Sequence, residues 1–233
     1  MRGQALLLHG AGGGSWEWNI WCRVLRGAGF APCPLDLEPV PAGLTHTRWD
    51  DYATQARDAA ERLATPRIVI GASLGGLLAL AVAESLRCAA LVLINPLPPL
   101  PEATGLPERD PYPAIVPWRR DARLAGTRRA LPDADDLACL YAFRHWRDES
   151  GAVLNHARAG IAITAPACPV LVMASTNDQD IPAPISAALA KRMSASLLRI
   201  DGSHVGPLLG RPAADCARQA VDWLNSLPEF RTD

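Results

Sequence analysis

Six short aliphatic runs, separated by longer stretches with helical spacing, constrain the fold of this chain more than any other feature. A strand that is buried on both faces is a short continuous apolar run, and helices between such runs cover both faces of a parallel sheet. The runs lie at residues 5–8, 30–35, 67–70, 89–95, 170–175 and 196–200. They predict an α/β fold with a mostly parallel central sheet flanked by helices.

Apolar residues recur at helical spacing between several of these runs. This spacing places them on one face of a helix, and we expect those faces to pack against the sheet. The residues are Trp18, Trp21, Cys22 and Leu25, then Tyr52, Ala56, Ala60 and Leu63, and near the end Cys216, Ala220, Trp223, Leu224 and Leu227.

Residues 96–165 interrupt the alternation, since they contain no convincing strand. The segment opens with a proline-rich run, in which each proline removes a backbone donor and restricts the residue before it. Two helical patterns rich in arginine and acidic residues follow. A long excursion between two strands is usually functional. We expect a helical cap at 96–165, inserted between two parts of one core domain, 1–95 and 166–233.

Composition excludes several classes of protein. The net charge is −1, from 23 basic and 24 acidic residues, which gives no electrostatic argument for a nucleic-acid partner. The six cysteines form no C-x-x-C pair, so buried thiols in a reducing compartment are favoured over disulfides or a zinc site. No secretory signal is visible, and glycines and a serine break the longest apolar stretch, 68–83. We expect a cytoplasmic protein with no membrane partner.

The stretch GASLG, Gly71 to Gly75, carries the strongest functional signal. It matches G-x-S-x-G and lies between an apolar run and a helical pattern, the context in which this motif exposes a nucleophilic serine at a sharp turn. Flanking glycines are needed there because side chains would collide with neighbouring elements. Ser73 is therefore the candidate nucleophile of a nucleophile elbow, and it requires a base and an orienting acid.

With this motif the chain resembles the α/β-hydrolase family, in which the acid and then the histidine follow the serine along the chain. The resemblance implies that the acid lies just after the strand at 170–175. Asp178 fits the family pattern, with Pro182 in register, although Ser175 stands where a glycine is usual. Asp180 is the alternative.

The same resemblance implies that His204, in the loop after the last strand, completes a Ser-His-Asp catalytic triad. The other histidines fit less well, because His46, His145 and His156 are not near a strand end.

His9 and Gly10 resemble the family's His-Gly loop, which contributes to the oxyanion hole. The resemblance implies that the backbone amides of Ala11 and Leu74 stabilise the oxyanion, with Gly12 as a less favoured donor. His9 itself is expected to be a structural hydrogen-bonding residue. The glycines at 12–14 have no G-x-G-x-x-G or Walker spacing, so they do not indicate phosphate binding.

Met1 lies almost directly before the first run, so we expect about six strands rather than the eight of many relatives. The predicted function is hydrolysis of a small carboxylic ester, or a thioester, through an acyl-serine intermediate and without a metal or cofactor. Trp118, Tyr141 and Trp146 either line the substrate pocket or pack the cap on the core.

Two alternatives to ester hydrolysis remain. One is a lyase or carbon–carbon bond hydrolase that uses the same triad. Related cyanide lyases depend on a pocket lysine, and the single lysine here, Lys191, is expected on a helix away from the pocket. The other is a non-catalytic member of the fold that binds a small ligand.

Overall fold

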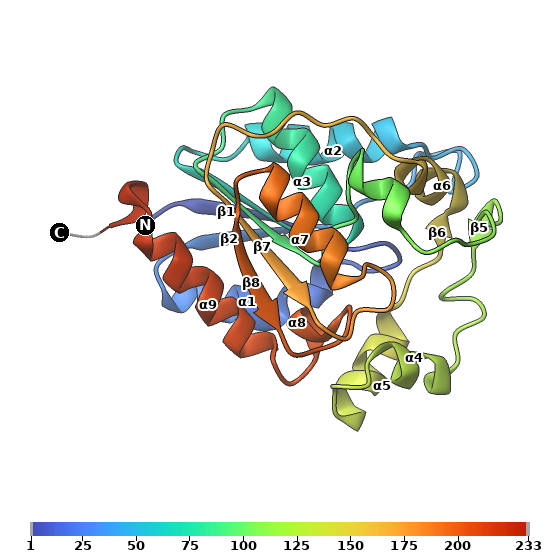
Figure 1. Cartoon of the computed structure of the whole chain (residues 1–233). Helices are drawn as coiled ribbons and strands as arrows, with labels where there is room; N and C mark the ends of the chain where they lie inside the picture. The colour runs from blue at the N-terminus through green and yellow to red at the C-terminus, as the bar shows by residue number, and fades with distance from the viewer. Residues whose placement is uncertain (1, 232–233) are drawn as a thin grey trace.

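A six-stranded sheet in the order β2-β1-β3-β4-β7-β8 forms the centre of the computed structural model, which describes residues 2–231 (Figure 1). Every neighbouring pair of strands is parallel. The prediction of a mostly parallel sheet of about six strands is therefore confirmed. The strands are β1 (Gln4–Leu8), β2 (Ala31–Leu35), β3 (Arg67–Ala72), β4 (Ala90–Ile94), β7 (Val170–Ser175) and β8 (Ser196–Ile200).

Helices cover both faces of this sheet, and the side chains of each strand alternate between the two sides. Leu6 and Leu8 of β1 belong to the core on one side, whereas Ala5 and Leu7 belong to the core on the other. The first side holds α2 (Trp49–Glu61), α3 (Leu74–Ser85) and α7 (Ala183–Arg192), and the second holds η1 (Ser15–Trp18), α1 (Asn19–Gly27), α8 (Gly206–Leu209), α9 (Ala213–Ser226) and η3 (Pro228–Phe230).

The helical spacing identified the residues that fill these two cores. Trp18 and Trp21 are fully buried, with their rings edge to face, and Tyr52 of α2 is also buried. Trp223 is only partly buried, because its indole lies at the rim of α9 and donates a hydrogen bond to Ser196 Oγ.

Residues between β4 and β7 form an insertion. Its elements are η2 (Glu102–Gly105), β5 (Ile115–Val116), α4 (Leu124–Ala130), α5 (Asp136–His145), β6 (Glu149–Ser150) and α6 (Gly151–Ala159). The proline-rich run holds no α-helix, whereas β5 and β6 form an antiparallel pair that the sequence did not indicate. Strands of two residues are too short to show an alternating pattern. In Figure 1, α4 and α5 form a pair set apart from β5, β6 and α6.

The strand register brings the chemistry-bearing loops to one edge of the sheet. Leu8 at the end of β1 is paired with Gly71 of β3, and Ala72 is paired with Ile94 at the end of β4. Because all strands are parallel, the loops that follow them leave from the same edge, where ligands of open α/β sheets bind. Within the described residues, every helix is too short or too polar to cross a membrane.

Candidate active site

Ser73 occupies a strained turn between β3 and α3. Its backbone has φ 50° and ψ −117°, a conformation that residues other than glycine rarely adopt. The tight turn explains the glycines around it. A Cβ on Gly71 would lie 2.1 Å from the carbonyl oxygen of Gly75, and a Cβ on Gly75 would lie 2.1 Å from that of Leu8. Only glycine fits both positions.

Backbone hydrogen bonds from the neighbouring strand hold this turn in place. The Ser73 amide donates to the carbonyl of Ile94 at 3.0 Å, and the Leu97 amide donates to the Ser73 carbonyl at 2.9 Å. The serine side chain is thus presented at the edge of the sheet by a turn that is braced on both sides.

His204 lies in the loop between β8 and α8, and its ring is held by Asp178. The distance from His204 Nδ1 to Asp178 Oδ2 is 2.6 Å. Asp178 follows β7, is 6% exposed, and accepts two further hydrogen bonds at Oδ1, from the amides of Asp180 and Ile181. Asp180 is exposed and forms an ion pair with Arg109. Of the two candidate acids, Asp178 is therefore the one that bonds to the histidine.

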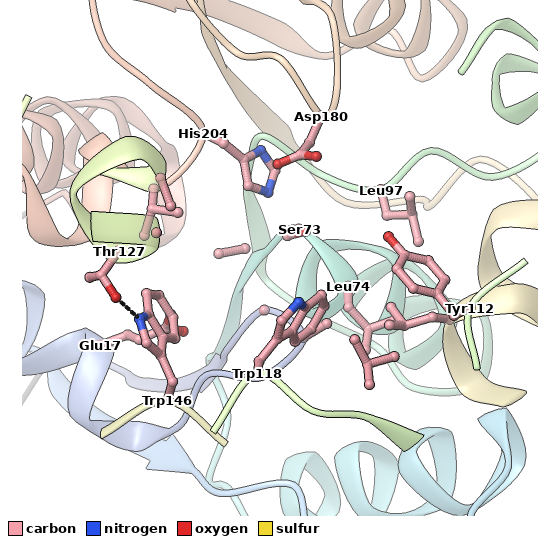
Figure 2. Close-up of a pocket in the computed structure, with 18 of the residues that line it drawn as sticks. Glu17, Ser73, Leu74, Leu97, Tyr112, Trp118, Thr127, Trp146, Asp180 and His204 are labelled. Carbon is pink, nitrogen blue, oxygen red and sulfur yellow. Dashed lines mark hydrogen bonds between the residues drawn. The ribbon is translucent and has the colours of Figure 1, made fainter. Parts of the chain in front are cut away.

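The surroundings of His204 shift the pKa of its imidazole ring. Burial is the strongest influence on its pKa and lowers it, but the hydrogen bond and charge of Asp178, with the charge of Asp180, raise the pKa above its ordinary value of 6.5. Since Nδ1 is bonded to a carboxylate, Nε2 is the nitrogen left to exchange a proton with a substrate or nucleophile. His204 and Ser73 line the same cavity (Figure 2).

His9 braces the loop after β1 and stays neutral. Its Nε2 accepts a hydrogen bond from the Leu37 amide at 3.0 Å, so Nδ1 carries the proton and donates to the Gly10 carbonyl at 2.7 Å. Burial lowers the pKa of His9 to about 4. The braced Gly10 lies against the serine, since a Cβ on Gly10 would lie 3.3 Å from Ser73 Cβ.

The backbone amides around Ser73 fall into two groups. The Gly12 amide donates to Glu149 Oε2 at 3.1 Å, so it is already engaged. The Ala11 amide has no hydrogen-bond partner within residues 2–231. Leu74 begins α3, so its amide has no partner inside the helix. Ala11 and Leu74 also line the cavity beside Ser73. These two amides, unlike that of Gly12, are therefore free to donate to a ligand in the cavity beside Ser73.

Sequence reasoning missed Glu149, which connects the insertion to the His-Gly loop. It is 3% exposed, and its Oε1 accepts hydrogen bonds from the Tyr52 hydroxyl at 2.9 Å and the Ser150 amide at 2.8 Å. With Oε2 bonded to Gly12, the carboxylate is fully engaged. No motif marks this residue, because two of its partners, Gly12 and Tyr52, come from distant segments.

Asn95 was also missed, and it explains the serine at position 175. Its amide nitrogen donates to Ser175 Oγ at 2.9 Å and to the His204 carbonyl at 2.8 Å, while its oxygen accepts from the Ser175 amide at 2.7 Å. Ser175 therefore supplies a hydrogen-bond partner where relatives commonly have a glycine, and Asn95 anchors the histidine loop to β7.

The cavity above Ser73 has a volume of about 610 Å³ and is lined largely by the insertion. Of the three aromatic residues for which the sequence allowed either role, Trp118 and Trp146 line the cavity and Tyr141 does not. The Tyr141 ring packs at the surface against Trp16 and His145, and its hydroxyl accepts a hydrogen bond from Asn19. The lining also includes Glu17, which sequence reasoning did not single out (Figure 2).

Among the described residues, Asp178, Asp180 and His204 are the group of potential metal ligands that lies closest together, each with one ligand atom within 4.8 Å of the others. Hydrogen bonds and the Arg109 ion pair account for the side chains of all three. The arrangement is therefore explained by a histidine–carboxylate pair with a neighbouring ion pair, and it does not require a metal ion.

Comparison with known proteins agrees with this geometry. A sequence model of the alpha/beta hydrolase family matches residues 5–219. None of the curated proteins matches the chain significantly.

Solved structures share the whole fold at low sequence identity. A mutant of polyneuridine aldehyde esterase is 14% identical, with a TM-score of 0.73 over 96% of this chain and 99% of that chain. A pyrethroid hydrolase from Sphingobium faniae is 18% identical, with a TM-score of 0.72 over 98% and 99%. The monoacylglycerol lipase of Paleococcus ferrophilus is 20% identical, with a TM-score of 0.68 over 97% and 95%. At these identities the likeness shows the fold.

Proposed function

Because this chain belongs to the alpha/beta hydrolase family, we propose that it is a serine hydrolase that cleaves a small carboxylic ester or thioester through an acyl-serine intermediate. One observation carries the proposal. Ser73, on its strained turn, lines the same cavity as His204, whose ring is hydrogen-bonded to the buried carboxylate of Asp178. A nucleophile, a base and an orienting acid in that relation are the parts that acyl transfer requires.

The mechanism follows from these positions. Ser73 Oγ attacks the carbonyl carbon of the ester while His204 Nε2 takes the hydroxyl proton, and Asp178 stabilises the resulting imidazolium. The amides of Ala11 and Leu74 donate to the oxyanion, and each such donor contributes about 3 kcal/mol to transition-state stabilisation. The alcohol leaves with the proton from His204. Water then attacks the acyl-serine while His204 takes its proton, and the carboxylic acid is released as Ser73 regains its proton.

Several features support a small substrate. A cavity of about 610 Å³ lies within the range of small-molecule sites. Residues 96–165 supply much of its lining, and we propose that they act as a cap over the core formed by 1–95 and 166–233. The names of the solved relatives, an esterase, a pyrethroid hydrolase and a monoacylglycerol lipase, favour ester substrates. Six free cysteines favour a cytoplasmic location.

The lyase alternative has less support. Lys191 lies on α7, is exposed, and is not part of the cavity lining. A mechanism that depends on a pocket lysine therefore has no suitable residue at this cavity.

A fluorophosphonate probe and a panel of nitrophenyl esters test the proposal. The wild type should be labelled and should hydrolyse short-chain esters, while Ser73→Ala should lose both labelling and all but a few per cent of turnover. Ser226→Ala, at an exposed serine on α9, serves as the control and should behave as the wild type. Labelling without ester turnover would favour a lyase, and absence of labelling would favour a ligand-binding protein.

A further inference from the structure

Gly13, within the glycine run at 12–14, makes room for a buried carboxyl group. Glu17, in η1 directly after them, is 3% exposed, and its carboxyl lies against Gly13. A Cβ on Gly13 would lie 2.3 Å from Glu17 Oε2, so any larger residue there would displace the acid. Within a glycine run that matches no phosphate-binding spacing, Gly13 thus accommodates the Glu17 side chain.

The Glu17 carboxyl has no charged partner. Its Oε2 has no hydrogen-bond partner within residues 2–231, and none of the ion pairs found in that range includes Glu17. Burial is the strongest influence on its pKa and raises it from 4.5 to about 8, while the amides of Gly10 and Gly14 and the charge of His204 lower it. Glu17 therefore holds its proton at neutral pH, and a protonated carboxyl is a hydrogen-bond donor.

The acid also faces the substrate cavity. Glu17 lines it together with Ser73, Ala11 and His204, and Figure 2 shows it beside the indole of Trp146. The indole Nε1–H donates to Thr127 Oγ1 at 3.0 Å, so it is not available to the carboxyl. The other charged groups that line the cavity are the Arg109–Asp180 pair and, on the insertion, Asp121, Arg123, Arg129 and Arg158.

We propose that Glu17 is a substrate-binding residue whose neutral carboxyl donates a hydrogen bond to a second oxygen in the acyl part of the ester. The acyl side is favoured because Glu17 follows the loop that carries the Ala11 amide, which would receive the carbonyl oxygen. Esters of alkoxy, hydroxy or keto acids have such an acceptor, whereas simple alkanoyl esters do not. This inference rests on the proposed ester hydrolysis.

Ionisation of Glu17 should oppose the reaction. A carboxylate in the cavity loses its donor and repels both the acceptor oxygen and the developing oxyanion. Activity on an acceptor-bearing ester should therefore fall as the pH rises past about 8, where Glu17 ionises. The variant Glu17→Gln cannot ionise and keeps an N–H donor, so it should lack this decline.

Two nitrophenyl esters of the same shape test the hydrogen bond. Methoxyacetate differs from butyrate by one oxygen in place of a methylene group. Each kcat/KM is first divided by the rate of hydroxide hydrolysis of the same ester, which removes the difference in chemical reactivity. On this scale we expect the wild type to prefer the methoxyacetate ester by about 3- to 10-fold, the factor that one neutral hydrogen bond contributes. Glu17→Leu should lose the preference but still cleave the butyrate ester, and Glu17→Gln should keep it.

Thermal melting tests the protonated state without any turnover. A folded-state pKa that is raised above 4.5 means that the folded state holds the proton while the unfolded state releases it, so the wild type loses stability between about pH 4.5 and 8. The Tm of Glu17→Gln relative to the wild type should therefore rise across that range. Glu61→Gln, at an exposed glutamate of α2, should show no such trend.

The outcomes separate this inference from the proposed function. Turnover of both esters with an equal preference in the wild type and Glu17→Leu would overturn the role of Glu17 and leave the hydrolase intact. If the Tm difference between Glu17→Gln and the wild type does not change with pH, Glu17 is ionised in the folded protein. That result would also overturn the role of Glu17. Failure to cleave either ester would instead overturn the proposed function.

Discussion

Two residues with strained backbone lie in the candidate active site. Ser73 and Asn95 are two of the three non-glycine residues with positive φ in the described chain, and they follow the paired strand ends Ala72 and Ile94. Each such conformation costs about 1–3 kcal/mol and persists only where the surroundings determine it. Here Ser73 presents its hydroxyl, and Asn95 holds the carbonyl of His204. The strain therefore positions the two ends of the proposed proton transfer.

The two acids after β7 should differ strongly in their effect on catalysis. We expect Asp178→Asn to lower kcat by about four orders of magnitude, because an amide at this position no longer holds the histidine in its productive tautomer. Asp180→Asn is the matched control and should reduce kcat far less, since Asp180 pairs with Arg109 at the surface. Steady-state kinetics of the two variants test this. The opposite order would assign the orienting role to Asp180.

The pH profile should report the state of His204. Its neutral form accepts the serine proton, so activity rises with pH as the imidazolium loses its proton. Because the pKa of His204 is raised, the midpoint of this rise should lie above 6.5 for the butyrate ester. Asp178→Asn should move the midpoint of its residual activity downward. Appreciable activity at pH 4 would contradict a histidine base.

At the scale of elements, the elbow depends on close contact between β1 and α3. The Cβ of an alanine at position 75 would lie 2.1 Å from the carbonyl oxygen of Leu8, which is backbone and cannot rotate away. The first turn of α3 therefore packs directly on the end of β1. This contact keeps the serine turn and the His-Gly loop together.

Gly75→Ala should accordingly destabilise the fold. Overpacking against backbone costs about 1–3 kcal/mol, and each kcal/mol lowers the Tm of a chain of this size by roughly 2–4 °C. Gly27→Ala provides the control, because nothing lies within 4 Å of a Cβ at that position near the end of α1. Thermal melting of both variants measures the difference. An equal Tm for the two would contradict the tight contact.

The insertion and the core are joined at β6, where Glu149 engages the Gly12 amide. In Glu149→Gln, the side-chain NH₂ group would face the Gly12 amide, or the Gly12 amide would lose its hydrogen-bond acceptor. We expect kcat to fall about tenfold, equivalent to about 1.4 kcal/mol, because the neighbouring Ala11 amide shifts. Tyr52→Phe removes a different hydrogen bond to the same carboxylate and should affect Tm more than kcat. Equal loss of kcat in both variants would indicate a general structural role.

At the scale of the whole molecule, a parallel sheet gathers residues from distant parts of the chain. The loops after β1, β3, β7 and β8 leave from one edge, and the insertion after β4 lines the cavity together with residues of these loops. Structures that are 14–20% identical to this chain share its fold. In this chain the apolar strands form the two cores of the sheet, whereas the cavity lining comes largely from the inserted segment.

The assembled site should act without a metal ion. The groups in the closest cluster, Asp178, Asp180 and His204, are engaged by hydrogen bonds and an ion pair, so ester hydrolysis should be unchanged after dialysis against a chelator. Rates measured before and after dialysis, and after adding back zinc or calcium, test this. Loss of activity that is restored by one metal would contradict the serine mechanism.

The amino-acid sequence by itself determined the sheet, the elbow and the order of the candidate triad. Aliphatic runs, helical spacing and the G-x-S-x-G turn are local features, and local features depend on neighbours in the chain. The G-x-S-x-G turn predicted Ser73 as the nucleophile, and the resemblance to the α/β-hydrolase family predicted Asp178 and His204 as its partners. Only the tertiary structure decided which acid bonds to the histidine, that Glu149 engages Gly12, and that Tyr141 packs outside the cavity. It also decided that Glu17 is buried and that its Oε2 has no hydrogen-bond partner among residues 2–231. These outcomes depend on contacts between segments far apart in sequence, and no local pattern records them.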